Sequence, residues 1–492
     1  MILSVLDKKW IGIGLLLLSG CINMSKEEQS HDLIAPPSLQ SSIEKSLESS
    51  FFVTGDWPKQ AWWEIFESPS LNALIEESIG NNPTLQSVSQ RIEQARQEAK
   101  VARSRLFPYL FFDATESWTY LSKNGLYRAL NPTVPLNANL VDLTLSFTYE
   151  FDFWGKNLNR FRSALGEQRA MQAQTAQAEL LTTTAVAQAF FALKANLLRE
   201  QLYKELYTVR TEIWQLQEQM QTEALQSKFP YLRTAENVGE AEKLLFSVQE
   251  QIATTKHQLN VLAGRGPDEP LDIDPHLNEY CTALTLPDNL SLDLLSRRPD
   301  LMAQIWHVES LAHEVGAAKA DFFPNVNLTA LMGLESIFYR TLFEKQSKTG
   351  SLQPAIHLPI FTAGAIRANV RSKKAAFEEA LFAYNNLILA SSQEVADLLA
   401  LVHSVFSQKK TQNVILSDAL DRLELTELTL DKGLSTAFDL YAVQEEVILK
   451  ELENVNLLYG QYLASIKLIK ALGGGYQSGY DVPLSAPQGG SS

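Results

Sequence analysis

The chain has 492 residues, of which 45% are hydrophobic and 20% are charged, and its formal net charge is −15. A chain of this length usually folds as two or three globular domains. The acidic balance argues against a nucleic-acid partner, because phosphate backbones are bound by clustered lysine and arginine. The two cysteines, Cys21 and Cys281, are too few for a disulfide framework or a metal site built from several cysteines.

The N-terminus has the features of a bacterial export signal. Lys8 and Lys9 precede an apolar run, residues 10–18, that is too short to stay in a membrane as a spanning helix. Residues 18–21 then read Leu-Ser-Gly-Cys. We expect residues 1–20 to be a lipoprotein signal peptide and Cys21 to carry a covalent lipid, with no other cofactor. The alternatives are an uncleaved anchor and a simple secretory signal.

The residues after this cysteine favour the outer membrane. Residue 22 is isoleucine rather than the aspartate that usually retains bacterial lipoproteins in the inner membrane. The stretch that follows is polar and serine-rich, so we expect residues 21–60 to form a flexible, lipidated tether.

The clearest periodic pattern lies at residues 141–153, where apolar and polar residues alternate without interruption. A soluble half-buried strand averages about 5–6 residues, whereas a transmembrane barrel strand needs about 9–11. The length predicts a transmembrane strand with its apolar face toward lipid and Asp142, Glu150 and Asp152 toward a water-filled passage. A long strand of a soluble sandwich is the alternative, and ordinary hydration also accounts for the carboxylates.

Three further segments, 107–120, 325–334 and 351–360, have a similar alternation and complete two hairpins. The connecting stretches, 121–139 and 335–350, are long and polar, as extracellular barrel loops are. Four strands cannot close a barrel, and an open sheet edge in lipid leaves backbone groups unpaired. Several chains must therefore share one barrel. Two would give eight strands with an interior filled by side chains, and three would leave a passage.

The rest of the chain is predicted to be helical. Residues 156–225 and 364–430 contain no proline, and apolar residues recur at heptad spacing, for example at Leu202, Leu206 and Val209 and again at Leu416, Leu420 and Leu423. At 1.5 Å per residue each helix would reach roughly 100 Å, too long for a globular domain. Return helices are expected at about 231–262 and 436–472.

The chain also repeats itself. Asn82-Pro83-Thr84-Leu85 matches Arg298-Pro299-Asp300-Leu301, and at the same offset Phe107-Pro108 matches Phe323-Pro324. Each half thus contains a helix, a β-hairpin, a long helix, a tip and a return helix. We assign the first repeat to residues 61–265, with its hairpin at about 107–153 and helices at 156–262. The second covers residues 266–476, with its hairpin at 323–361 and helices at 364–472, and 477–492 form a tail.

With these motifs in this order, the chain resembles TolC-like outer-membrane efflux proteins of the lipoprotein (OprM or NodT) branch. The resemblance covers nearly all of residues 15–476. Besides the Leu-Ser-Gly-Cys sequence, it is carried by the residues 62–66 (WWEIF), 149–156 (YEFDFWGK), 297–301 (RRPDL), 322–324 (FFP), 358–361 (LPIF), 394–397 (EVAD) and 471–476 (ALGGGY).

The resemblance implies an α+β membrane protein: a homotrimer with one 12-stranded transmembrane β-barrel, four strands from each chain, continuous with a 12-helix periplasmic α-barrel. It also implies a place in the outer membrane and two partners, a periplasmic adaptor and an inner-membrane resistance-nodulation-division (RND) pump. The chain would be the passive exit duct for drugs or other small molecules. The alternatives are a duct for type I protein secretion and a structural coiled-coil surface lipoprotein.

In this family the helical tips contact the adaptor. The resemblance assigns this role to Ala224, Leu225, Gly433, Leu434 and Asp439. The second tip keeps the family pattern of glycine followed by aspartate six residues later, whereas the first tip has alanine and proline at these places. Glycine is favoured where a helix ends in left-handed geometry, so we expect Ala224 to alter that turn.

The periplasmic gate is expected beside the second tip, at Leu430, Asp431 and Ser435. Three copies of Asp431 would form an acidic ring that favours cations, although a solvated residue near a helix end is the plainer interpretation.

No enzymatic motif is convincing. His307 and His313 lie six residues apart, which does not place them on one helix face as a pair of metal ligands four apart would be. Residues 264–267 lack the Gly-Lys-Ser/Thr ending of a phosphate-binding loop and indicate a helix stop instead. We expect neither catalysis nor a metal site.

Overall fold

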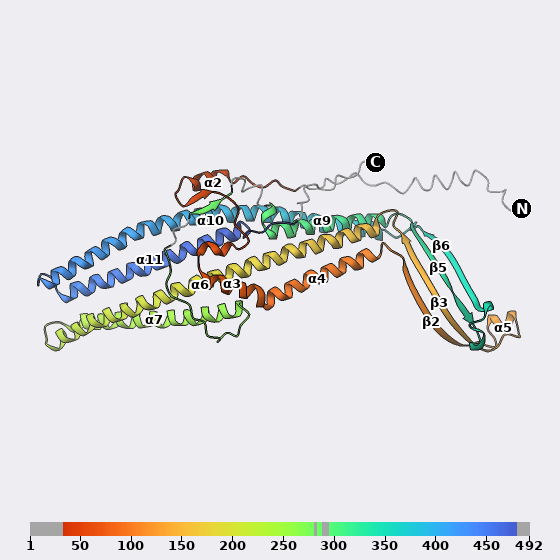
Figure 1. Cartoon of the computed structure of the whole chain (residues 1–492), viewed down its shortest axis with the longest axis horizontal. Helices are drawn as coiled ribbons and strands as arrows, with labels where there is room; N and C mark the ends of the chain where they lie inside the picture. Colours follow the sequence, from red (N-terminus) through yellow and green to blue (C-terminus); the bar gives the residue numbers. More distant parts are fainter. Residues whose placement is uncertain (1–32, 280–282, 288–294, 480–492) are drawn as a thin grey trace.

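The computed structural model describes residues 33–279, 283–287 and 295–479. The predicted signal peptide, the lipidation site Cys21, the first part of the tether and most of the C-terminal tail lie outside the described residues. The described chain is an elongated bundle of helices with a sheet at one end (Figure 1). This is the α+β arrangement expected from the sequence.

The sheet contains the four predicted long strands. They are β2 (Tyr109–Tyr120), β3 (Asn137–Phe151), β5 (Asn325–Ser336) and β6 (Lys348–His357). Their order is β2-β3-β5-β6, and all three pairings are antiparallel. The two predicted hairpins, β2–β3 and β5–β6, are therefore confirmed. They are joined through β3 and β5, so the two repeats share one continuous sheet.

The two long helices are α6 (Lys156–Thr222) and α10 (Ala365–Asp431), each of 67 residues. They are followed by α7 (Lys228–Leu262) and α11 (Ala437–Ala471), each of 35 residues, with which they form helical hairpins. On the sheet side, α4 (Pro83–Ser104) and α9 (Pro299–Ala320) each have 22 residues. The matching lengths confirm the internal duplication.

Each proline that begins α4 or α9 stands at the first helical position, where the missing N–H is not needed. By composition alone α10 also contains an 18-residue window apolar enough to cross a membrane. Of that window, 39% is buried, and α10 packs against α9 and α11.

The predicted flexible tether is wrong for the part of it that is described. Residues 40–47 form α2 (Gln40–Leu47), which packs on α10, and β1 (Phe52–Thr54) pairs in parallel with β4 (Leu284–Leu286). Leu39 and Phe52 are buried in the core that surrounds α9 and α10. Burial of these apolar side chains holds the segment on the helices at mid-length of the bundle.

Trp62 and Trp63 belong to a second hydrophobic core. Trp62 and Trp63 begin the 3₁₀-helix η1 (Trp62–Phe66), which precedes α3 (Pro69–Asn81), and both side chains are buried. Phe191 of α6 stacks on Tyr462 of α11 with ring centroids 4.1 Å apart, and Phe66 contacts both rings. These aromatic contacts join the two repeats.

The loops beyond the strands differ from the polar stretches predicted. The first contains a short helix, α5 (Leu126–Leu130), and the second contains the 3₁₀ turns η2 (Tyr339–Thr341) and η3 (Lys345–Ser347). Leu126, Leu130 and Phe343 are between 70% and 78% exposed. The loops at this end of the sheet, where Figure 1 shows α5, therefore expose apolar side chains.

Candidate passage and helical tips

The strand register collects the polar positions of all four strands on one face of the sheet. Asp142 lies opposite Thr115 of β2 and Glu335 of β5, and Thr148 lies between Tyr109 and Thr329. The other face is formed mostly by apolar residues; along β3 these are Val141, Leu143, Leu145, Phe147, Tyr149 and Phe151. One face can meet lipid while the other lines water.

The polar face is acidic. It contains four carboxylates, Asp113, Asp142, Glu150 and Glu335. Lys348, the only lysine or arginine within these four strands, pairs with Leu334 on the apolar face. Glu335 was not among the predicted lumen residues, because it falls in the predicted connecting stretch 335–350. The alternation that continues past residue 334 was the available signal.

Asp152 does not belong to this face. The strand ends at Phe151, and the Asp152 carboxylate accepts hydrogen bonds from the backbone N–H groups of Asn157 and Leu158, at 3.0 and 2.7 Å. It thus caps the start of α6, where Gly155 offers no side chain and the helix leaves N–H groups unpaired. The predicted lumen role of Asp152 is therefore corrected to a capping role.

Trp154 makes contacts at the junction between strand and helix. Its ring stacks on Phe323, with centroids 4.7 Å apart, and its Nε1 donates to the carbonyl oxygen of Pro324 at 2.8 Å. Lys156 pairs with Asp321 beside it at 2.9 Å. These contacts join the β3–α6 junction of the first repeat to the α9–β5 junction of the second. About half of the Trp154 surface stays exposed.

The two helical tips have the same turn, which corrects the expectation that Ala224 alters it. The N–H of Leu225 donates to the carbonyl of Met220 at 2.9 Å, and the N–H of Leu434 donates to that of Thr429 at 2.8 Å. Both bonds close a left-handed helix end of the Schellman type. Ala224 adopts the conformation without being glycine.

The tips differ in how their return helices begin. Thr436 and Asp439 form a reciprocal capping box at the start of α11. At the equivalent start of α7, Ser227 makes no side-chain capping hydrogen bond and Pro230 replaces the aspartate. Leu225 and Leu434 are exposed by 67% and 77%, as the predicted contact role requires.

The predicted gate residues lie together in the second tip. The carbonyl of Leu430 accepts from the N–H of Gly433 at 2.8 Å, and the Ser435 hydroxyl lies 3.1 Å from that of Thr429. Asp431 is the last residue of α10 and is exposed. The turn therefore holds one exposed carboxylate beside a set of satisfied polar groups.

Comparison with known proteins agrees with this geometry. The sequence matches the outer membrane efflux protein family over residues 74–265 and 290–474. It is 27% identical to the multidrug resistance outer membrane protein MdtP of Escherichia coli K12, over 94% of this chain and 95% of that protein. It is 29% identical to MdtQ of Escherichia coli O157:H7, which carries the same description, over 94% and 97%.

Solved structures share the fold. The outer membrane protein VceC of Vibrio cholerae has a TM-score of 0.76 at 28% identity, over 86% of this chain and all of that one. The CmeC outer membrane channel of Campylobacter jejuni has a TM-score of 0.80 at 22% identity, over 94% and 96%. With the family match extending over both repeats, the chain belongs to the outer membrane efflux protein family and is an outer-membrane channel protein.

Proposed function

We propose that this protein is the exit duct of a tripartite efflux system. Three copies would form a 12-stranded barrel in the outer membrane and a 12-helix tunnel in the periplasm. Drugs or other small molecules would pass through it after delivery by a periplasmic adaptor and an inner-membrane RND-type pump. The observation that carries this proposal is the open, two-faced sheet.

The sheet is incomplete in one chain. Strands β2 and β6 are its edges, and neither has a second partner strand within the described residues. Their unpaired N–H and C=O groups would be very unfavourable in lipid, so neighbouring chains must pair with them. Three chains supply twelve strands, and a barrel of that size leaves a passage that an eight-stranded barrel does not.

The helices support the same assembly. Phe382, Leu389, Val414 and Leu425 are 50–63% exposed and recur on one side of α10. A long helix with an uncovered apolar stripe requires a partner helix. Neighbouring copies would cover this stripe and close the helices into a tunnel.

Small molecules are the favoured cargo because both relatives named above are described as multidrug resistance proteins. A type I protein-secretion duct is the alternative. A gene for an RND pump beside this one would support the proposal, whereas one for an ATP-binding-cassette exporter would support the alternative. A purely structural surface lipoprotein accounts for the helices but not for the two-faced sheet.

The lipid anchor is a separate part of the proposal. Cleavage before Cys21 and acylation of its thiol would attach the mature chain to the membrane in addition to the barrel. Mass spectrometry of the mature N-terminus tests this directly. An unmodified Cys21 or an intact signal peptide would remove the anchor and leave the channel unaffected.

The first experiment is to measure the mass and shape of the detergent-purified protein by light scattering and negative-stain imaging. We expect a threefold particle much longer than it is wide. A compact monomer would contradict the shared barrel and with it the duct.

The second experiment concerns the gate. Asp431→Ala should raise the single-channel conductance of the purified protein in a planar bilayer, since three shorter side chains would widen the constriction proposed there. Glu223→Ala, which removes an exposed charge at the other tip, is the matched control. An unchanged conductance for Asp431→Ala would place the gate elsewhere.

A further inference from the structure

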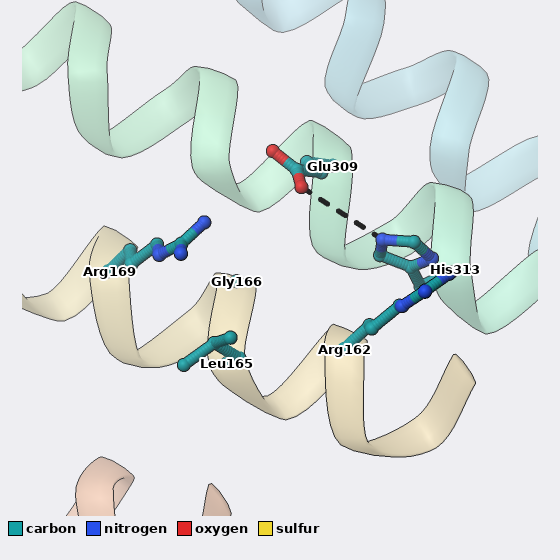
Figure 2. Close-up of a pocket in the computed structure, with 6 residues that line it drawn as sticks. All are labelled: Arg162, Leu165, Gly166, Arg169, Glu309 and His313. Atoms are coloured by element: carbon teal, nitrogen blue, oxygen red, sulfur yellow. Dashed lines mark ion pairs between the residues drawn. The ribbon is translucent and has the colours of Figure 1, made fainter. Parts of the chain in front are cut away.

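A polar pocket lies between α6 and α9, away from the sheet face and from the tips. Its volume is about 330 Å³. It is lined by Arg162, Leu165, Gly166 and Arg169 of α6 and by Glu309 and His313 of α9. Figure 2 shows the two arginines on one side and the glutamate and histidine facing them from the other.

The close contact of the two helices positions these groups. A Cβ atom on Gly166 would lie 3.1–3.2 Å from the backbone and Cβ of Ser310, so only glycine fits without displacement. At the same contact, the hydroxyl oxygens of Ser163 and Ser310 are 3.0 Å apart. Arg162 and Arg169 are seven residues apart, about two helical turns, and therefore project from the same side of α6 on either side of this contact.

The charge in the pocket is positive at neutral pH. Burial and the positive charge of Arg162 lower the pKa of His313, which leaves its imidazole neutral. Burial raises the pKa of Glu309, and the attraction of Arg169 offsets this only in part. The two guanidinium groups are always charged. A basic pocket thus occurs in a chain whose formal net charge is −15.

The pocket also contains groups with unused hydrogen-bonding capacity. Arg162 makes no hydrogen bond or ion pair with the part of the chain that the structure describes, and its charge acts on the neighbouring His313. The Oε2 atom of Glu309 is buried without a hydrogen-bond partner. A buried polar atom without a partner is unfavourable, so a bound group that satisfies it would be stabilised.

We propose that this pocket binds a tetrahedral oxyanion, a sulfate or phosphate group, held between Arg162 and Arg169. The planar guanidinium presents paired N–H donors that match the oxygens of such a group. Glu309 can donate to a third oxygen only when its carboxyl is protonated, the form that burial favours. Since Arg162 and Arg169 lie about 10–20 Å along α6 from the sheet, the phosphate of a membrane lipid is one source of the ligand and free phosphate is the other.

Titration calorimetry of the purified protein with sulfate, at constant ionic strength set by chloride, tests the site. Sulfate is used because its charge does not change near neutral pH. Arg162→Gln and Arg169→Gln should each weaken sulfate binding about tenfold, the loss of one charge-assisted contact. Arg160→Gln makes the same charge change on α6 outside the pocket and should leave binding unchanged.

The variant Glu309→Gln distinguishes an effect on binding chemistry from a loss of folding, because a misfolded site would bind sulfate more weakly, not more tightly. The substitution keeps the shape of the side chain, excludes the ionised form and offers an N–H donor at every pH, so it should tighten sulfate binding by up to about fivefold. Equal affinities for wild type, Arg162→Gln, Arg169→Gln and Arg160→Gln would overturn the proposal, as would weaker binding in Glu309→Gln.

The source of the ligand is found by competition. Displacement of sulfate after transfer into nanodiscs containing phosphatidylglycerol, but not into zwitterionic ones, would identify a lipid headgroup. Displacement by inorganic phosphate alone would identify the free ion. Neither result depends on whether the protein conducts drugs, so failure of this site and failure of the duct are distinguishable.

Discussion

Ala224 and Gly433 adopt the same left-handed backbone conformation, with φ of 56° and 68°, at equivalent positions of the two helical tips. Glycine adopts this conformation without a steric penalty, whereas an L-residue with a Cβ pays about 1–2 kcal/mol. The first tip therefore keeps the turn of the second at a local conformational cost.

Replacement of this alanine relieves that cost. Ala224→Gly should stabilise the first tip by about 0.5–1 kcal/mol, after the greater freedom of glycine in the unfolded chain is subtracted. Slower hydrogen exchange of the amides around Leu225 measures this. The converse variant, Gly433→Ala, meets no atom within 4 Å of its new Cβ and should destabilise the second tip through backbone strain alone. Faster exchange in Ala224→Gly would contradict the assignment.

Acidification should destabilise the first turn of α11 but not the first turn of α7. Hydrogen bonds from the side chain and backbone of Thr436 hold the pKa of Asp439 below its ordinary value of 3.8. A carboxyl with a lowered pKa stabilises the folded state above its unfolded pKa, and this contribution is lost as the pH falls through the folded value. Hydrogen exchange of the first turn of α11 should therefore accelerate below pH 3.8 relative to the rest of the helix.

The first tip supplies the internal control for this pH effect, because α7 has Pro230 where α11 has Asp439. Its first turn should show no acid-dependent opening of this kind. Asp439→Asn should remove the dependence in α11, and an unchanged profile in that variant would show that another group is responsible.

A buried arginine joins three parts of the second repeat. Arg298 donates to Asp300 at 2.7 Å, to Glu394 of α10 at 2.8 Å and to the carbonyl of Ala471 at the end of α11 at 3.0 Å. Burial lowers the pKa of this guanidinium, but the two carboxylates outweigh burial and raise it above its ordinary value. The ion is therefore satisfied within the core.

Arg298→Gln should destabilise the protein by about 3 kcal/mol, because it leaves carboxylates and a carbonyl without their donor. Arg298→Lys should restore only part of this, since one ammonium cannot reproduce the planar arrangement. Arg297→Gln is the neighbouring control; its guanidinium lies 5.8 Å from the ring of Trp57, a contact worth about 0.5–1 kcal/mol. Denaturant unfolding of the detergent-purified protein measures all three, and equal losses for Arg297 and Arg298 would refute the specific role.

The acidic face of the sheet should select ions. Asp142→Asn combined with Glu335→Gln should lower the ratio of cation to anion permeability, measured as the reversal potential in a salt gradient across a planar bilayer. Glu116→Gln is the matched control, because Glu116 pairs with Val141 on the opposite face. A control that changes selectivity as much as the double variant would show that the acidic face does not line the passage.

Much of the local structure followed from periodicity in the sequence. The period-two alternation in residues 141–153 predicted β3, which the structure ends at Phe151, and heptad spacing around Leu206 predicted α6. Each pattern records which side of an element is apolar. The internal match around Pro83 and Pro299 predicted two copies of the same unit. These features depend only on residues near one another along the chain.

Periodicity was less reliable in showing which residues of a helix are covered. The predicted seam position Leu420 is 43% exposed, while its neighbour Ala419 is buried. Which side of a long helix is covered depends on the neighbouring helices, and their placement is not encoded in the spacing of one segment.

The tertiary structure alone decided the relations between distant segments. It paired β3 with β5, which set Glu335 opposite Asp142, and it folded part of the predicted tether onto α10. It placed the Asp152 carboxylate at the start of α6, where it caps the helix, and it placed Ala224 in the left-handed conformation that glycine favours. A repeating pattern in the sequence specifies that a face must be covered or that a helix must end. Which segment covers that face, and which residue takes a strained backbone conformation, is fixed only when segments far apart in the sequence come into contact.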